Sequence, residues 1–459
     1  MAISPRKPDV QNDGHEPKIQ DVVVVGAGIA GLAVANALRL KGINVTVYER
    51  ASQLDRQRGA GTGLSPNGQR CLHALGFSHE MVLDVSTPIR EHILCNEDRV
   101  LVRSDYPWRL YEKYKMPITG TLRGGLVNMM AEPLRKSKSL HCGEAVTNVE
   151  ERPGTGKIIV TLASGKTHET DLVVGADGIH STLAPLVLGK EMDPPIYTGS
   201  SIFFGVIDNF QKGPQSLPPA DTTQLAGLID HPAAIVQVLG PIKLFLVAGG
   251  AGSEKKLVWK LSYPTQTPPM RKEWALAEGT VRKEVQAYLD ERRNSGAKVA
   301  TISVIQDLLD RTSDARLLHF GLFSRKEKAY WHKDRLVLIG DAAHATLPHV
   351  GQGANMALED AVVLADALEA HDFRHVEAAL SSFYARRRER TKRIVESSRV
   401  MGWFLDARTP VGVWLRNAVL VGAMRMDCNY SNFHAPEIPD DTSHGCKGVR
   451  LQDQSGVSR

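Results

Sequence analysis

The length and composition of the chain limit its fold class and its partners. The sequence has 459 residues, 42% of them hydrophobic, and a net charge of +5 at pH 7. This length exceeds the usual size of one domain, so we expect two domains with a cleft between them. The small net charge gives no reason to expect nucleic-acid binding. The five cysteines, at positions 71, 95, 142, 428 and 446, have neither metal-ligand spacing nor a paired framework, which favours no metal and a reducing, cytoplasmic compartment.

The first motif follows an N-terminal arm. Residues 1–18 lack the apolar core of a signal peptide and are expected to be flexible. Four valines at 22–25 predict a parallel strand that is buried on both faces. The Gly-x-Gly-x-x-Gly spacing of Gly26, Gly28 and Gly31 then predicts a tight turn at which the backbone can approach a pyrophosphate.

The residues after this turn complete a dinucleotide-binding fingerprint. A helix is predicted over 32–40, and the N–H groups at its start favour a phosphate. A second strand over 43–48 ends at Glu49 and Arg50, where a carboxylate can accept hydrogen bonds from ribose hydroxyls. A glycine motif alone is a weak signal, but the flanking strand, helix and acid argue against an incidental turn. At this point the dinucleotide can be FAD or NAD.

The next segments leave this unit and return to it. A glycine-rich loop is expected at 58–67, followed by a helix over 68–75. Residues 87–117 have short, mixed patterns and a cluster of four aromatic residues, so we expect an excursion into a second domain. Arg123 then opens a predicted helix over 124–135.

The middle of the chain is rich in strand signals. Strands are predicted at 145–150, 157–162 and 171–175, and the last ends in an Asp-Gly turn that contains Asp177. Such a turn can bring the carboxylate near the pyrophosphate side of a cofactor, although alone it would be read as a plain turn. Alternating and apolar runs over 202–261 predict an antiparallel sheet.

The last motif indicates a flavin. After a predicted helix over 271–293, residues 336–340 form another buried strand that ends at Asp341. A carboxylate there can bind a polyol hydroxyl such as those of a ribityl chain. A helix over 355–370 follows, and its N-terminus can stabilise negative charge on a reduced isoalloxazine ring. Together with the first fingerprint, this motif predicts FAD.

The C-terminal part is expected to be helical. An arginine-rich run at 386–393 is expected to form a solvated helix face with local ion pairs, or alternatively to touch anionic lipid. The apolar stretch at 411–424 contains Arg416 and Asn417 and is too short to span a bilayer. We therefore expect a helix packed on the body and no transmembrane segment, and peripheral membrane contact stays open.

These elements predict an α/β protein with a Rossmann-like FAD-binding domain, an inserted and mostly antiparallel β-sheet substrate domain, and a C-terminal helical region. The FAD-binding domain is expected to be discontinuous in sequence. Its expected segments are 19–86, 118–190 and 320–400; the substrate domain has 87–117 and 191–319, the C-terminal helical region has 401–434, and a polar tail has 435–459.

In the order of these motifs the chain resembles the class A flavoprotein monooxygenases, which include para-hydroxybenzoate and salicylate hydroxylases and fungal natural-product enzymes. The resemblance covers roughly residues 20–400, and it implies which residues bind FAD. Those residues are Gly26, Gly28, Gly31, Glu49, Arg50, Gly61, Gly63, Arg123, Asp177, Asp341, Gly353, Ala354 and Asn355.

The same resemblance implies the chemistry. NADPH or NADH reduces the flavin, which reacts with O2 to give a C4a-hydroperoxide that inserts one oxygen atom into a small organic substrate by aromatic hydroxylation or epoxidation. This intermediate survives only away from water, so the sheet at 202–261 is expected to cover the ring with an apolar wall. No second nucleotide fingerprint is evident in the sequence, which therefore does not choose between NADPH and NADH.

Two departures from the family pattern bear on the substrate. Phe204 stands where many relatives have an arginine, and Ser181-Thr-Leu-Ala184 replaces the usual Ser-x-x-Arg. A cation near the ring is lost in both cases. We therefore expect a comparatively apolar substrate that is neutral or weakly ionised.

The sequence does not identify a catalytic side chain. His349 lies in the loop expected to face the flavin and could donate a proton or orient the substrate, but a loop histidine bonded to backbone is at least as good an interpretation. His231 could act as a base, although a histidine in a hairpin turn is the better interpretation. His344 is expected to support its loop rather than transfer protons.

Two other functions are compatible with parts of the pattern. A flavin dehydrogenase or reductase on the same fold would keep FAD and transfer hydride without inserting oxygen. A noncatalytic protein with this fold could escort another protein or a lipid. The intact flavin-side motifs argue against the escort protein.

Overall fold

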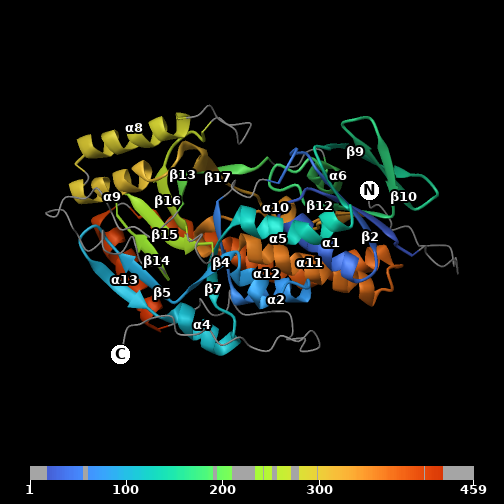
Figure 1. Cartoon of the computed structure of the whole chain (residues 1–459), viewed down its shortest axis with the longest axis horizontal. Coiled ribbons are helices and arrows are strands. Elements are labelled where there is room, and N and C mark those ends of the chain that lie inside the picture. Colours follow the sequence, from blue (N-terminus) through green and yellow to red (C-terminus); the bar gives the residue numbers. More distant parts are fainter. Residues whose placement is uncertain are drawn as a thin grey trace, which may run out of the picture.

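The computed structural model describes residues 18–54, 60–189, 194–208, 233–240, 242–250, 256–269, 279–296, 298–407 and 409–426. These residues build two large hydrophobic cores, one around each of the two main sheets. The predicted α/β class is confirmed, with a Rossmann-like sheet, a second and mostly antiparallel sheet, and helices toward the C-terminus (Figure 1).

The first core is organised around a six-stranded sheet with the order β18-β19-β12-β1-β2-β8. β1 (Asp21–Val25) lies inside the sheet and pairs in parallel with β2 (Asn44–Glu49) and β12 (Leu172–Gly175). The four valines of β1 are almost fully buried, as their β-branched run predicts. The other strands of this sheet are β8 (Leu140–Cys142), β18 (His332–Lys333) and β19 (Leu336–Leu338).

Helices cover this sheet and pack on one another. α1 (Ile29–Leu40) follows β1 directly and packs against α5 (Arg123–Lys136) and α11 (Gly353–Ala370). α11 in turn contacts α2 (Pro66–Ala74) and the long helix α12 (Val376–Leu405). The helices predicted in these regions are therefore confirmed, and they gather near the centre of the molecule (Figure 1).

Two small sheets complete this part of the molecule. One has β9 (Val146–Arg152), β10 (Lys157–Leu162) and β11 (Thr167–Thr170) in antiparallel pairing. The other has the order β3-β7-β4, with β3 (Gly61–Leu64), β4 (Ser86–Ile89) and β7 (Ile118–Leu122). The segment expected to be a glycine-rich loop thus contains a short strand, because Gly61 and Gly63 pair with β7.

The second core lies on a seven-stranded sheet with the order β17-β13-β16-β15-β14-β5-β6. All neighbouring pairs are antiparallel except β14 and β5, so the predicted antiparallel sheet is confirmed. The predicted excursion joins it, since β5 and β6 belong to this sheet. Its strands are β5 (Glu91–Cys95), β6 (Val100–Ser104), β13 (Ile196–Ile207), β14 (Ala234–Val238), β15 (Lys243–Gly249), β16 (Lys256–Pro264) and β17 (Leu317–Ser324). Domain boundaries stay a prediction.

The two faces of this sheet contact different parts of the protein. Phe203 and Trp259 point to one face and pack with α8 (Thr280–Asn294) and α9 (Val299–Asp310). Phe204, on the other face, belongs to a separate apolar cluster that includes Leu122 of β7 and Leu347 of the loop before α11. Side-chain alternation along β13 and β16 produces this division.

Helix α8 confirms part of the helix predicted over 271–293, whose residues 271–278 lie outside the described part of the chain. The other helical elements within the described residues are short. They are α3 (His79–Leu83), α4 (Tyr106–Tyr114), α6 (Ala184–Leu188), α10 (Asp341–His344), η3 (Asp314–Arg316) and η4 (Pro348–Val350).

The C-terminal helix α13 (Pro410–Met426) packs on β6, as expected for a helix on the body of the protein. Trp403 and Trp414, at the end of α12 and in α13, are 78% and 69% exposed. Among the residues described, no helix has both the length and the apolar character that a membrane crossing requires. Peripheral membrane contact stays a prediction.

Candidate active site

The first glycine motif forms a tight turn between β1 and α1. Gly26 has a φ of 100°, and a Cβ at this position would lie 2.7 Å from the carbonyl oxygen of Ala176. A Cβ on Gly31 would overlap the carbonyl oxygen of Gly26, so both positions require glycine. Gly28 is different, because in the described part of the chain the only atom near its Cβ position is the Nη2 of Arg123 at 3.4 Å. The backbone of Gly28 is therefore open to a ligand.

Glu49 is held beside this turn by main-chain hydrogen bonds. Its Oε2 accepts from the N–H of Ala27 at 2.8 Å, and its Oε1 accepts from the N–H of Ala51 at 2.8 Å. The carboxylate therefore has a fixed position at the end of β2 and keeps lone pairs for a further donor. Arg50, the next residue, is exposed.

Arg123 links the two sequence motifs electrostatically. Arg123 has solvent-exposed surface, but the protein around its guanidinium group removes much of its hydration and lowers its pKa. The negative charges of Glu49 and Asp341 raise the pKa and oppose this shift. Asp341 is likewise exposed but enclosed: desolvation raises its pKa, and the nearby charges of His344 and Arg123 oppose the shift. Desolvation by the surrounding protein is thus the largest cause of both pKa shifts, and neighbouring charges oppose it.

The backbone brings the second motif to the first. Gly340 has a φ of 57°, and a Cβ there would lie 3.0 Å from the Cβ of Ala30 in the first turn of α1. The main-chain N–H of Arg123 donates to the carbonyl of Ala60 at 3.1 Å, which ties the start of α5 to β3 and Gly61. Segments more than 300 residues apart in sequence, around Ala30 and Gly340, thus share one region of the protein.

Asn355 connects the loops at the start of α11. Its Oδ1 accepts from the N–H of Ser65 at 3.0 Å, and its Nδ2 donates to the carbonyls of Gly63 at 3.1 Å and Gly351 at 3.0 Å. The side chain is fully buried and engaged with protein, which leaves only its main chain for a ligand. Gly353 and Ala354 are half-buried in the first turn of α11, where the N–H groups of a helix are unpaired.

Asp177 stabilises its own turn. Its Oδ2 accepts from the main-chain N–H of Thr182 at 2.7 Å and from the Thr182 hydroxyl at 3.1 Å. Its Oδ1 is buried and has no hydrogen-bond partner within the described residues. The Cα of Asp177 would lie 3.1 Å from a Cβ on Gly26, so this carboxylate is next to the glycine turn.

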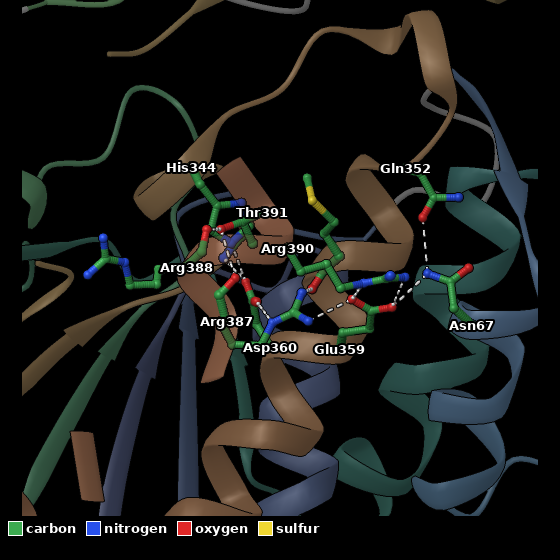
Figure 2. A network of polar contacts seen from close by, with 11 residues as sticks. Asn67, His344, Gln352, Glu359, Asp360, Arg387, Arg388, Arg390 and Thr391 are labelled. Atoms are coloured by element: carbon green, nitrogen blue, oxygen red, sulfur yellow. Dashed lines mark hydrogen bonds and ion pairs between the residues drawn. The ribbon is translucent and has the colours of Figure 1, made fainter. Parts of the chain in front are cut away.

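A buried ion-pair network below this region corrects one prediction (Figure 2). The run at 386–393 lies in the predicted long helix, but Arg387 and Arg390 are not solvated: they are 0% and 8% exposed. Arg387 pairs with Glu359 at 2.7 Å and with Asp360 at 2.8 Å, and Arg390 pairs with Glu359 at 2.8 Å. The prediction was wrong for these two residues because α12 turns them toward two acids of α11. It is confirmed for their exposed neighbour Arg388.

The network also reaches the cofactor loops. His344 Nε2 lies 2.6 Å from Asp360 Oδ2, the oxygen that accepts from the main-chain N–H of Gly340 at 2.9 Å. Asn67 donates to Glu359 at 2.8 Å and to Gln352 at 3.0 Å. His344 therefore supports its loop, as predicted. The missed sequence signal is the Glu359-Asp360 pair in the apolar middle, 356–365, of the helix 353–370.

His349 lies between this region and the second sheet. Its ring contacts α12, since a Cβ on Gly402 would lie 2.7 Å from it. Burial lowers the pKa of His349 to about 4, with further contributions from Lys260 and Lys243, so the imidazole is neutral at pH 7. His349 has no hydrogen bond to another described residue, so the structure gives no support to the interpretation of a histidine bonded to backbone. His231 lies outside the described residues.

The sheet face opposite β3 and β7 is mainly apolar. Phe204 is 4% exposed there and belongs to one cluster with Leu122, Val258 and Leu347. A Cβ on Gly61 would lie 2.7 Å from the side chain of Val258, so β3 touches β16 directly. This face is where the sequence predicted an apolar wall.

Known proteins with the same features identify the family. A family model described as FAD binding domain matches residues 20–214 and 264–398. The chain belongs to this family of FAD-dependent monooxygenases. It is 30% identical to FAD-dependent monooxygenase pigN of Monascus ruber over 84% of this chain and 87% of that protein. It is 32% identical to 3-amino-4-hydroxybenzoate 2-monooxygenase of Streptomyces cremeus over 76% of this chain and 78% of that protein.

Solved structures show the same fold. HpxO of Klebsiella pneumoniae, solved with FAD and uric acid, superposes with a TM-score of 0.73 at 22% identity, over 90% of this chain and 96% of that chain. A salicylate hydroxylase substrate complex gives a TM-score of 0.68 at 20% identity, over 92% and 99% of the two chains. The resemblance to class A flavoprotein monooxygenases is therefore confirmed, and the cofactor of this enzyme is FAD. Within the described residues no cluster of metal-ligating side chains could hold a metal ion.

Proposed function

We propose that this FAD-dependent monooxygenase uses NADPH or NADH and O2 to hydroxylate a small, largely apolar aromatic substrate in natural-product biosynthesis. The observation that carries the proposal is the direct contact between β3, which contains Gly61, and the apolar face of the seven-stranded sheet around Val258. An apolar face beside the cofactor loops excludes water where oxygen is transferred. The similarity to a Streptomyces enzyme named as an aromatic monooxygenase supports hydroxylation over epoxidation.

We propose the following roles for the residues around FAD. The main chain at Gly28 takes the pyrophosphate, Glu49 accepts from a ribose hydroxyl, and Arg123 balances the negative charge between Glu49 and Asp341. The N–H groups at Gly353 and Ala354 stabilise negative charge on the flavin ring. When bound, FAD supplies the acceptance of hydride from the nicotinamide and the transfer of oxygen. The protein supplies orientation and exclusion of water.

We propose that one core binds FAD and the other binds the substrate. The segments 19–86, 118–190 and 320–400 would form the FAD-binding domain, and 87–117 with 191–319 the substrate domain. The pairing of β5 with β14 supports the early segment as part of the second domain. Phe204 and its neighbours on the sheet would then form the wall of the substrate site.

The test is a screen of aromatic compounds for stimulated consumption of NADPH and NADH by the FAD-loaded protein. The proposal predicts that a subset of phenols or aminophenols accelerates oxidation of one nicotinamide and that O2 uptake accompanies it. Product formation without O2, with an artificial electron acceptor, would favour the dehydrogenase alternative. A purified protein that is colourless and takes up no added FAD would contradict the proposal and favour an escort protein.

A further inference from the structure

A lysine stands in the apolar face of the seven-stranded sheet. Lys260 lies on β16, directly opposite Phe204 of β13 and Phe245 of β15. Its Nζ is 4.3 Å from the centre of the Phe245 ring, a cation–π contact. Its neighbour Trp259 points to the other face, into the core with α8 and α9. Alternation therefore directs Lys260 to the face that also carries Val258.

This face is turned toward the cofactor loops. Val258, two residues before Lys260, contacts the Gly61 position, and Val247 of the neighbouring strand would lie 3.0 Å from a Cβ on Gly120 of β7. His349 approaches from the loop before α11, near enough for the charge of Lys260 to lower its pKa. The ammonium group thus lies over the Phe245 ring, on the same face as its cross-strand neighbour Phe204 and near the neutral imidazole of His349.

The charge of Lys260 has no carboxylate partner in the described part of the chain, whereas nearby lysines have one. Lys243 pairs with Asp406 at the end of α12, and Lys256 pairs with Asp208 at 2.9 Å. Among the described residues, the charged or titratable groups near Lys260 are His349, which is neutral, and the Lys243–Asp406 pair. Burial lowers the pKa of Lys260 to about 8, because an unpaired ammonium loses hydration without a compensating anion.

We propose that Lys260 is the substrate-recognition cation of this enzyme and binds an anionic oxygen of the aromatic substrate between Phe204, Phe245 and His349. The inference rests on the proposed function and names the substrate class as phenols or benzoates. It goes beyond the expectation of a neutral or weakly ionised substrate, which followed from the loss of a cation at Phe204 and at Ala184. The neighbouring strand supplies the positive charge instead.

The two possible anions reach Lys260 by different routes. A benzoate arrives ionised and pairs with the ammonium group. Lys260, with a pKa of about 8, is already mainly an ammonium group at pH 7, so a phenol transfers its O–H proton to solvent and the phenolate pairs with the ammonium group. A phenolate is the more electron-rich ring, so this transfer would also favour attack by an electrophilic oxygen. In both cases the burial of Lys260 is compensated by a charge-assisted hydrogen bond.

The test measures binding to the FAD-loaded wild type and to Lys260→Met, Lys260→Arg and Lys256→Met. Lys256→Met is the matched control, because it removes a lysine from the same strand and face whose charge Asp208 already pairs. The probes are 4-nitrophenol, 4-nitrobenzoate and the neutral 4-nitroanisole. Quenching of flavin fluorescence gives the dissociation constants, and difference absorbance shows whether the phenol is bound as its visible-absorbing phenolate.

We expect Lys260→Met to weaken binding of the nitrophenol, the nitrobenzoate or both by about 10- to 100-fold, which is the effect of losing one charge-assisted hydrogen bond. Binding of 4-nitroanisole should change less than about twofold. Lys260→Arg should retain anion binding, and Lys256→Met should match the wild type. The anion whose affinity falls identifies phenolate or carboxylate as the group recognised.

Equal affinities of the wild type and Lys260→Met for both anions would overturn the inference, as would failure of the wild type to bind either anion. Such a result would leave the proposed function intact if the same preparation contains FAD and consumes NADPH or NADH with a substrate. A wild-type protein that takes up no FAD contradicts the proposed function instead, before any probe is added.

Discussion

At the scale of single residues, we expect the FAD site to depend most on Arg123. Among the described residues it is the one side chain close to the Cβ position of Gly28, and the charges of both Glu49 and Asp341 act on it. Without this cation, two carboxylates and the phosphates of FAD would share one enclosed region. Repulsion between like charges in such a region is only weakly screened by solvent.

We predict that Arg123→Met weakens FAD binding by about 10- to 100-fold, the effect of losing one charge-assisted contact, with little change in unfolding temperature. Fluorescence titration of the apoprotein with FAD measures the affinity. Arg135→Met, in the last turn of the same helix, is the control and should bind FAD like the wild type. An unchanged affinity of the Arg123 variant would show that this side chain does not contact the cofactor.

His349 gives a prediction about pH. Burial lowers its pKa from 6.5 to about 4 in the folded protein, so between these values the unfolded chain binds more protons. The neutral form therefore stabilises the fold above pH 6.5, and this contribution is lost as the pH falls toward 4.

Replacement by glutamine, His349→Gln, should remove this dependence. Chemical denaturation at pH 7 and at pH 4.5 should show that the wild type loses about 2 kcal/mol more than the variant over this interval. Equal losses would mean that the imidazole titrates in the fold as it does in water.

At the scale of elements, the contact between α11 and α12 combines stability with positioning. Arg387 is fully buried between Glu359 and Asp360, and the same acids hold Asn67 and His344. Replacing one partner of a buried ion pair leaves an uncompensated charge, which costs more than the pair itself contributes.

We predict that Arg387→Met lowers the free energy of unfolding by about 3–5 kcal/mol. Arg388→Met, one residue further along the helix on an exposed position, should change it by less than about 0.5 kcal/mol. Denaturant unfolding of the wild type and the two variants measures these free energies. Similar stabilities would mean that Arg387 is not paired in the folded protein.

The contact between α11 and α12 also shows which features the sequence alone does not predict. The glycine turn with Glu49 was predictable because its geometry depends on neighbouring residues and has a fixed spacing. The burial of Arg387 was not, because its partner Asp360 lies 27 residues earlier on another helix. The alternating pattern of β16 predicted a strand of a sheet. It did not predict that the face carrying Lys260 would be covered by β7 and by the loop before α11.

At the scale of the whole molecule, the two cores contact each other through the small sheet with β3 and β7. Glycines of the small sheet, Gly61 and Gly120, allow β3 and β7 to approach the apolar face of the large sheet closely. Helix α12 runs from the first core, where it pairs with α11, to the second, where its last turns pack with α13 (Figure 1). This arrangement brings the FAD loops and the apolar sheet face together, as expected if oxygen is transferred between them away from water.

The mass of the product formed under ¹⁸O2 tests this account most directly. A substrate found by the nicotinamide screen is incubated with the FAD-loaded protein and NADPH or NADH in ¹⁸O2, and in parallel in ordinary O2 with labelled water. We predict one labelled oxygen atom in the product from O2 and none from water. Turnover that yields a product without label from O2 would contradict oxygen insertion by this enzyme.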